Sequence, residues 1–176
     1  MKDIKNVFEK KGYKVKCFID SKSACEEILK DIKLEDTIGI GGSVTVLDMG
    51  LYQALSDRGN TVYWHWKSED KKETFKKAKD ADIYLSSVNA ITRDGKIVNM
   101  DGTSNRVSSM IYGHRDVYLI IGKNKLCDNY EAAIDRIYNI CAPINAKRIK
   151  VNTPCASTGV CSDCDSPERI CCTEVI

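Results

Sequence analysis

One stretch decides the fold class: TIGIGGSVT, at residues 37–45. Residues 37–40 predict a short strand. The paired glycines that follow lead into a segment where apolar side chains recur at helical spacing as far as Leu55, and Gly59 follows as a helix stop. A strand, a glycine-rich turn and a helix in direct succession are typical of an α/β protein.

The same alternation of helix and strand continues on both sides of this stretch. We expect helices over 2–11, 23–33, 69–79, 105–112 and 128–141, and strands over 13–17, 61–64, 82–85, 117–121 and 148–151. Asp94-Gly95 predicts a hairpin turn. Such alternation over residues 1–152 predicts one α/β domain, a three-layer α/β/α fold with a mostly parallel sheet and helices on both faces. Residues 153–176 look irregular and are expected to form a cysteine-rich tail.

Composition and charge argue against several classes of function. Lys and Arg number 27 against 25 Asp and Glu, so the formal net charge of +2 gives no reason to expect binding to nucleic acid or to an anionic membrane. No apolar run approaches the roughly 20 residues that a transmembrane helix needs, so we expect no membrane insertion. The charged start of the chain lacks the apolar core of a signal peptide, and we therefore expect a cytoplasmic protein.

Polar or glycine-rich loops follow predicted strands at residues 39–45, 86–89, 101–106 and 122–125. Because ligands bind at the carboxyl ends of the strands in a parallel sheet, we expect these loops to form one cleft for a small anion, a carboxylate or a phosphate. The expected ligand contacts are Gly41, Gly42, Ser43, Thr45, Asn89, Asn105, Arg106 and Lys123. Arg106 and Lys123 would supply positive charge, and Asp101 would act as a catalytic acid or base. The alternative is that these residues only make turns and cap helices, but four such loops at one sheet edge favour a pocket.

The nine cysteines are many for a cytoplasmic chain of this length, and five of them lie within residues 155–172. A reducing compartment disfavours structural disulfides, so this clustering indicates metal ligation or catalysis. The other thiols, Cys17, Cys25, Cys127 and Cys141, are scattered and fit core or surface positions.

The clustered thiols are spaced as a set of ligands. Cys155, Cys161 and Cys164 follow a C-x5-C-x2-C pattern, and six residues separate Cys164 from Cys171. Four thiolates suit a tetrahedral zinc ion or an iron–sulfur cluster, and we favour a cluster of the 4Fe–4S type over zinc. Cys172 is then surplus, and would either replace Cys171 as a ligand or remain free. A reduced tail without metal is the remaining alternative, but it gives no reason for five neighbouring thiols.

Six segments carry a family resemblance. They are GIGGSVT at 39–45, SSVNAIT at 86–92, DGTSNR at 101–106, GKNK at 122–125, APINAKR at 142–148 and TPCASTGVCSDCDSPERICC at 153–172. Together they resemble the LUD-domain family, which includes lactate utilisation proteins. The resemblance implies a fold similar to those of ribose-5-phosphate isomerase, glucosamine-6-phosphate deaminase and the CoA-transferases. In those relatives the glycine-rich loop and an Asp-Gly loop line a site for phosphorylated sugars or acyl-CoA.

The resemblance also implies a function. It indicates a redox subunit or accessory protein in the oxidation of lactate or a similar small hydroxy acid, with an iron–sulfur cluster. Redox protein partners and a homo-oligomer are further expectations. Two alternatives stay open: an isomerase or lyase acting on a small phosphorylated or carboxylated substrate, and a binding module stabilised by zinc. The glycine-rich loop has no glutamate that could serve as the nucleophile of a CoA-transferase, which argues against acyl transfer.

Overall fold

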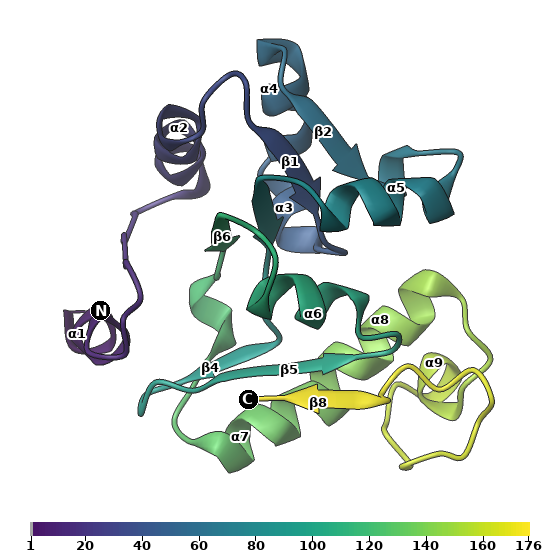
Figure 1. Cartoon of the computed structure of the whole chain (residues 1–176). Coiled ribbons are helices and arrows are strands. Elements are labelled where there is room, and N and C mark those ends of the chain that lie inside the picture. Colours follow the sequence, from purple (N-terminus) through teal and green to yellow (C-terminus); the bar gives the residue numbers. More distant parts are fainter. Residues whose placement is uncertain (1) are drawn as a thin grey trace. The chain divides into compact units, whose positions relative to one another are not determined.

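Residues 37–40 form strand β1 (Thr37–Ile40) in the computed structural model, which describes residues 2–176. β1 lies inside a four-stranded sheet with the order β2–β1–β3–β6 (Figure 1). The other strands are β2 (Thr61–Trp64), β3 (Ile83–Ser86) and β6 (Asp116–Leu119). All the pairings in this sheet are parallel. The prediction of an α/β fold with a mostly parallel sheet is therefore confirmed.

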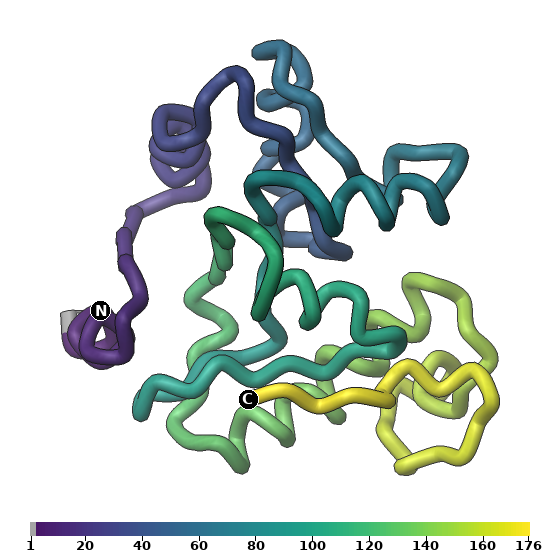
Figure 2. Tube along the Cα trace, viewed as in Figure 1, coloured from purple at the N-terminus to yellow at the C-terminus, as the bar shows by residue number. Residues whose placement is uncertain are grey.

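The chain folds into two compact units, and Figure 2 traces its path through them. Unit 1 comprises Lys14–Ser87 and Ser108–Gly122, and unit 2 comprises Lys2–Tyr13, Val88–Val107 and Lys123–Ile176. Each unit is thus assembled from segments that are separated along the sequence.

Helices cover both faces of the sheet in unit 1. They are α2 (Ser21–Asp31), α3 (Val44–Asp48), α4 (Leu51–Arg58), the 3-10 turn η1 (His65–Lys67) and α5 (Lys71–Lys79). Ile38 and Ile40 point to one face and pack with buried apolar side chains of α2, α3 and α4. Gly39 points to the other face, where a Cβ atom would collide with the carbonyl oxygen of Ala78 in α5. Helix α5 packs so closely on β1 that only glycine fits at position 39.

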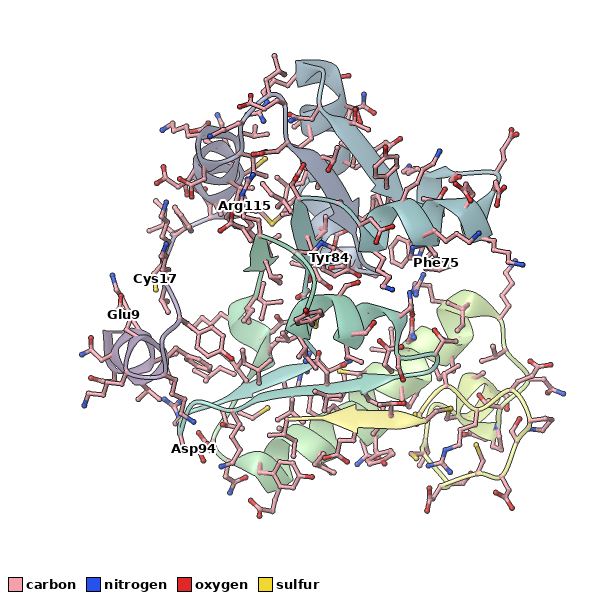
Figure 3. All side chains as sticks on the ribbon, in the orientation of Figure 1. Glu9, Cys17, Phe75, Tyr84, Asp94 and Arg115 are labelled. Atoms are coloured by element: carbon pink, nitrogen blue, oxygen red, sulfur yellow. The ribbon has the colours of Figure 1, made fainter. Side chains whose placement is uncertain are left out.

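Unit 2 is built on a second four-stranded sheet, of mixed direction, with the order β7–β4–β5–β8. Its strands are β4 (Ala90–Thr92), β5 (Ile97–Asp101), β7 (Leu126–Cys127) and β8 (Thr173–Val175). β4 and β5 form the hairpin that the sequence predicts, with Asp94 in its turn (Figure 3) and Gly95 at a φ of 84°. β8 pairs antiparallel with β5, and this pairing places Thr173 beside Asp101.

The remaining helices surround this second sheet or connect to it. They are α1 (Lys2–Glu9), α6 (Asn105–Ile111), the 3-10 turn η2 (Lys123–Lys125), α7 (Tyr130–Arg136), the π-helical turn η3 (Ile137–Cys141), α8 (Ala142–Ile149) and α9 (Pro154–Thr158). α7 and η3 contribute Ala133 and Ile137 to an apolar core that also holds Ala90 of β4 and Val98 of β5. α6 begins in unit 2 and ends in unit 1.

Three predicted elements are wrong. Residues 13–17 form no strand and instead connect α1 to α2. The single helix predicted to start at residue 44 is two helices, because Gly50 adopts a φ of 67° between α3 and α4. The strand predicted over 148–151 is the end of α8, which Lys150 closes at a φ of 60°.

Residues 153–176 contain α9 and β8, two short elements in a region predicted to be irregular. These residues belong to unit 2. In the described part of the chain, no helix combines the length and the apolar character needed to cross a bilayer.

Candidate functional site

The thiol segment, residues 153–172, folds as a short helix followed by a loop. Pro154 occupies the first turn of α9, where its missing N–H costs no hydrogen bond, and Gly159 ends the helix at a φ of 76°. Cys155 lies in the same first turn with its side chain buried. The loop turns again at Asp163, whose φ is 45°, and leads into β8. These turns fold distant parts of the segment back on one another.

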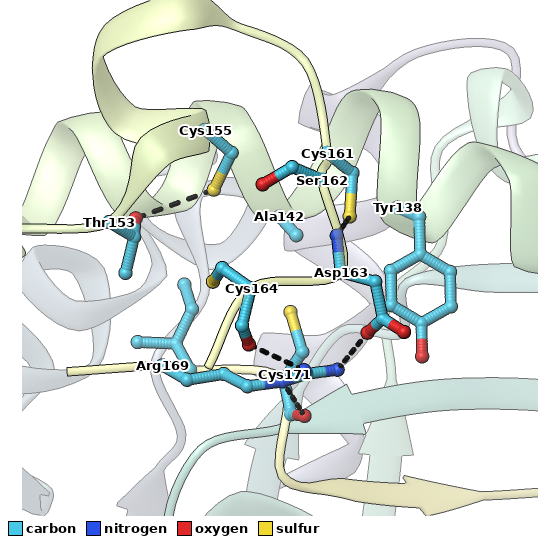
Figure 4. Close-up of a pocket in the computed structure, with 11 residues that line it drawn as sticks. Tyr138, Ala142, Thr153, Cys155, Cys161, Ser162, Asp163, Cys164, Arg169 and Cys171 are labelled. Carbon is cyan, nitrogen blue, oxygen red and sulfur yellow. Dashed lines mark hydrogen bonds and ion pairs between the residues drawn. The ribbon is translucent and has the colours of Figure 1, made fainter. Parts of the chain in front are cut away.

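Four thiols of this segment line one cavity, which we call the thiol cavity (Figure 4). They belong to Cys155, Cys161, Cys164 and Cys171. Figure 4 shows their sulfur atoms turned toward a common space, with Tyr138 of η3 at its side. The structure therefore brings together the four cysteines that the sequence predicts as ligands.

Cys172 does not line the thiol cavity, although it follows Cys171 directly. Its side chain is exposed, and its Sγ donates to the carbonyl oxygen of Arg169 at 3.3 Å. Its backbone N–H donates to the carbonyl oxygen of Asp101 at 3.2 Å, next to the pairing of β5 with β8. The backbone of Cys172 thus anchors the thiol segment to the sheet, while its thiol stays outside the thiol cavity.

Arg169 holds the loop of the thiol segment in shape. Its Nη1 donates to the carbonyl oxygen of Cys164 at 2.7 Å, and its Nε donates to that of Cys171 at 3.1 Å. Its Nη2 pairs with a carboxylate oxygen of Asp163 at 2.8 Å. One rigid guanidinium thereby fixes the backbone beside two of the four thiols and places a positive charge near them.

Without a bound cation, the Cys171 thiol favours its neutral form. Burial raises the pKa of Cys171 to about 11. Arg169 acts in the opposite direction, whereas negative charge on Cys161, Cys155 or Cys164 acts in the same direction as burial. A bound metal would reverse this balance, because coordination stabilises the thiolate.

The thiol cavity is not a ready-made site for a single metal ion. Within residues 2–176, no three His, Cys, Asp or Glu side chains are grouped so that they could hold one ion. A tetrahedral zinc ion with Zn–S bonds of about 2.3 Å needs its sulfur atoms within about 4 Å of one another. The donor set itself, four soft thiols around one space, fits thiolate-bound metal chemistry.

The glycine-rich loop lies in unit 1, where β1 ends. The N–H of Gly41 donates to a carbonyl oxygen of β3 at 3.0 Å. The hydroxyl oxygen of Ser43 caps α3 by accepting a backbone N–H of that helix at 3.2 Å. Gly42 lies between these two residues, and Thr45 lies in the first turn of α3. The loop therefore uses the hydroxyl of Ser43 for a helix cap.

Three predicted residues of unit 2 form one hydrogen-bonded network around Arg106, whose side chain is only 12% exposed. Its Nη2 donates to Asn89 Oδ1 at 3.1 Å, and its Nε lies 3.5 Å from Asp101 Oδ2. The same guanidinium donates to Asn99 Oδ1 at 2.8 Å and to the carbonyl oxygen of Met100 at 2.9 Å. Arg106 therefore ties β5 to the segment that precedes β4.

The carboxylate of Asp101 organises the start of α6. Its Oδ1 accepts the N–H groups of Thr103 and Ser104 at 3.2 and 3.1 Å, and its Oδ2 accepts that of Val107 at 3.3 Å. The amide oxygen of Asn105 accepts the hydroxyl of Thr103 at 2.7 Å. These contacts give Asp101 a structural task, and its role as a catalytic acid or base stays a prediction.

The sequence predicts Lys123 as a positive contact alongside Arg106. In the structure, Arg106 instead acts on the pKa of Lys125, which the sequence does not single out. Lys123 begins η2 with its side chain exposed, whereas Lys125, two residues later, is half-buried. Burial, together with the charges of Arg136 and Arg106, lowers the pKa of Lys125 to about 8, partly opposed by Cys141. The lowered pKa thus reports both burial and nearby positive charge.

Arg136 is a second residue that the sequence does not single out. It ends α7, and its Nε donates to the carbonyl oxygen of Asn89 at 3.2 Å. The helical spacing could have indicated Arg136 as a residue near the core. Ala133 and Ile137 are core positions, and Arg136 lies beside them on the helix. A charged residue on the apolar face of a helix therefore predicts a charge that lies next to the core.

Substituting Lys125 by methionine should stabilise the protein at neutral pH. Below about pH 8 the folded protein must hold a charged, half-buried ammonium, whereas the unfolded chain holds it in water with a pKa near 10.5. Removing this cost should raise the free energy of unfolding by about 1–3 kcal/mol. The gain should shrink as the pH rises from about 8 to 10.5, because the folded wild type then no longer carries the charge. Urea denaturation at several pH values measures both effects.

Lys123→Met is the matched control, since Lys123 shares η2 with Lys125 but is exposed. Its effect on the free energy of unfolding should stay within about 0.5 kcal/mol at every pH. Equal effects of the two substitutions would contradict the assigned environment of Lys125.

The family model of the LUD domain matches residues 1–176. A comparison with curated proteins finds no match. The match covers both units and includes the thiol segment.

Proposed function

The chain belongs to the LUD-domain family, and from this premise we propose that it is a redox subunit or accessory protein in the oxidation of lactate or a similar small hydroxy acid. An iron–sulfur cluster held in the thiol cavity would give it this role. A cluster of this kind accepts and passes on single electrons. The protein would then work with a redox partner that exchanges those electrons.

The observation that supports the proposal most is the convergence of four thiols on one cavity. Four thiols are the usual ligand set of such a cluster. Four thiolates also suit a tetrahedral zinc ion. Zinc bound for structure alone is therefore the second candidate.

The residues of the chain itself would prepare the cavity for the cluster. Arg169 fixes the carbonyl groups of Cys164 and Cys171, so the two thiols leave the backbone in defined directions. Its positive charge favours the thiolate that ligation requires. Tyr138 and Ile170 line the cavity and limit the access of water to the sulfur atoms.

Protein purified without oxygen should contain iron and acid-labile sulfide in equal amounts and be brown. The reason is that four thiols in one cavity bind a cluster as a unit, with little partial occupancy. Elemental analysis and visible absorbance of the full chain measure this directly.

The outcomes separate the candidates. Absence of both iron and colour in protein prepared without oxygen would refute the redox proposal. Stoichiometric zinc, together with loss of folding in a chelator, would favour the zinc-stabilised binding module.

A further inference from the structure

Thr153 occupies the N-cap position of α9, but its side chain does not cap that helix. A threonine at this position normally accepts a backbone N–H of the first turn with its hydroxyl oxygen. Within the described residues 2–176, the Thr153 side chain makes no such bond. The backbone carbonyl oxygen of Thr153 still accepts the N–H of Ala156 at 3.0 Å, so the helix begins without help from the hydroxyl.

The hydroxyl of Thr153 instead contacts the thiol of Cys155. Its Oγ1 lies 3.4 Å from Cys155 Sγ, and both residues line the thiol cavity (Figure 4). Both are buried, with exposures of 5% for Thr153 and 8% for Cys155. A buried hydroxyl needs a hydrogen-bond partner inside the protein, because burial removes it from water. The sulfur atom of a predicted ligand is that partner here.

Ligation would fix the direction of this hydrogen bond. A neutral Cys155 thiol either donates to the hydroxyl oxygen or accepts from it. A thiolate bound to a metal has no proton, so it only accepts. The hydroxyl of Thr153 would then donate to a sulfur atom that carries negative charge, and such a bond is stronger than one between neutral groups.

A second sulfur atom of the thiol cavity also accepts a hydrogen bond. The backbone N–H of Asp163 donates to Cys161 Sγ at 3.4 Å, at the turn where Asp163 has a φ of 45°. Thr153 precedes α9 and Asp163 follows it, so the two donors come from different parts of the thiol segment. Donors thus reach two of the four thiols.

We propose that Thr153 is a positioning residue of the thiol cavity, whose hydroxyl donates to the Cys155 sulfur and raises the reduction potential of the cluster. Reduction takes one electron from a one-electron donor, breaks no bond and makes the ligand sulfur atoms more negative. A hydrogen bond to such a sulfur therefore stabilises the reduced form more than the oxidised form. The inference rests on the proposed function, because it requires a cluster in the thiol cavity.

The test compares the wild-type full chain with Thr153→Val and Thr153→Ser, all purified without oxygen. Valine keeps the shape of threonine and suits the extended backbone of Thr153, whose φ is −119° and ψ 150°, but it lacks the hydroxyl. Titration with dithionite in the presence of redox dyes, followed by electron paramagnetic resonance, measures the midpoint potential. Thr153→Val should lower the equilibrium constant for reduction about three- to tenfold, and tenfold is about 59 mV for one electron. Thr153→Ser should restore the wild-type potential, because serine supplies the hydroxyl.

Ser157→Ala is the matched control. It removes another hydroxyl from α9, but Ser157 is exposed and donates to the carbonyl oxygen of Pro154 at 2.9 Å. Its potential should equal that of the wild type. Circular dichroism shows whether each variant is folded, and Thr153→Ala is a second variant without the hydroxyl if valine disturbs the packing.

Each outcome supports or overturns the inference. Iron that is lost from Thr153→Val but kept in Thr153→Ser would also support it, since only the hydroxyl differs in kind between the two side chains. Equal potentials in iron-loaded wild type and Thr153→Val, or failure of serine to restore the potential or the iron, would overturn this inference alone. A wild-type chain without iron would refute the proposed function and this inference together, so the two failures are distinguishable.

Discussion

Replacing Cys171 by serine should abolish iron binding, whereas replacing the adjacent Cys172 by serine should leave it intact. The two residues are neighbours in sequence, yet only Cys171 lines the thiol cavity. Cys172 is exposed and its thiol contacts the carbonyl oxygen of Arg169. Loss of one of four thiolates removes a ligand that water or a serine hydroxyl replaces poorly, since soft thiolates are what such clusters select.

Iron and sulfide analysis of both variants, purified without oxygen, measures this difference. Circular dichroism shows whether each variant is folded, and Cys161→Ser provides a second test at another member of the set. Equal iron in the Cys171→Ser and wild-type proteins would show that the thiol cavity does not hold the cluster. Equal loss in the two neighbouring variants would show that Cys172 is also a ligand.

Asp101→Ala should lower the free energy of unfolding by about 3–5 kcal/mol. The substitution leaves the guanidinium of Arg106 buried without its carboxylate, and it also removes the acceptor of three backbone N–H groups at the start of α6. Such a loss is a large share of the about 5–15 kcal/mol by which domains are stable. Denaturation in urea, followed by circular dichroism, measures it.

Asp128→Ala is the control for this prediction. Asp128 pairs with Arg93 at 2.7 Å, a shorter distance than the 3.5 Å between Asp101 and Arg106. Its pair is exposed, however, with side-chain exposures of 61% and 83% against 12% and 8%. Water and salt screen an exposed pair, so the expected loss is less than about 1 kcal/mol. Similar losses for the two substitutions would contradict the argument from burial.

Local patterns in the sequence predict much of the fold. The strand at 37–40 and the Asp94-Gly95 hairpin form as expected, because each depends on neighbouring residues. The predicted strand at 13–17 fails because alternation alone does not supply a partner strand. The prediction of a single helix across Gly50 fails for a different reason. The apolar spacing continues past Gly50, but the helical backbone conformation does not.

Local sequence patterns cannot predict the pairing of β8 with β5. It joins residues 97–101 to residues 173–175, and no local pattern reports a contact at that separation. For the same reason, the spacing of the cysteines predicts which four thiols meet but not that Cys172 turns away. The backbone N–H of Cys172 donates to the carbonyl oxygen of Asp101, which is another contact between distant parts of the sequence.

Lys123 and Lys125 show how little the sequence says about the surroundings of a charged residue. Both lysines of the GKNK segment look alike in sequence, yet in the structure Lys125 is half-buried and Lys123 is exposed. Burial of a charge is a tertiary property, and composition does not report it.

Strand β8 moves the edge of the second sheet from β5 to its own three residues. By pairing with Asn99, Met100 and Asp101, it occupies the backbone groups on one side of β5 that would otherwise face outward as an open template for another chain. β8 follows directly on the thiol segment, so disorder in that segment would release the strand and uncover the template. Disorder in the thiol segment is therefore expected to favour aggregation as well as to disturb the thiol cavity.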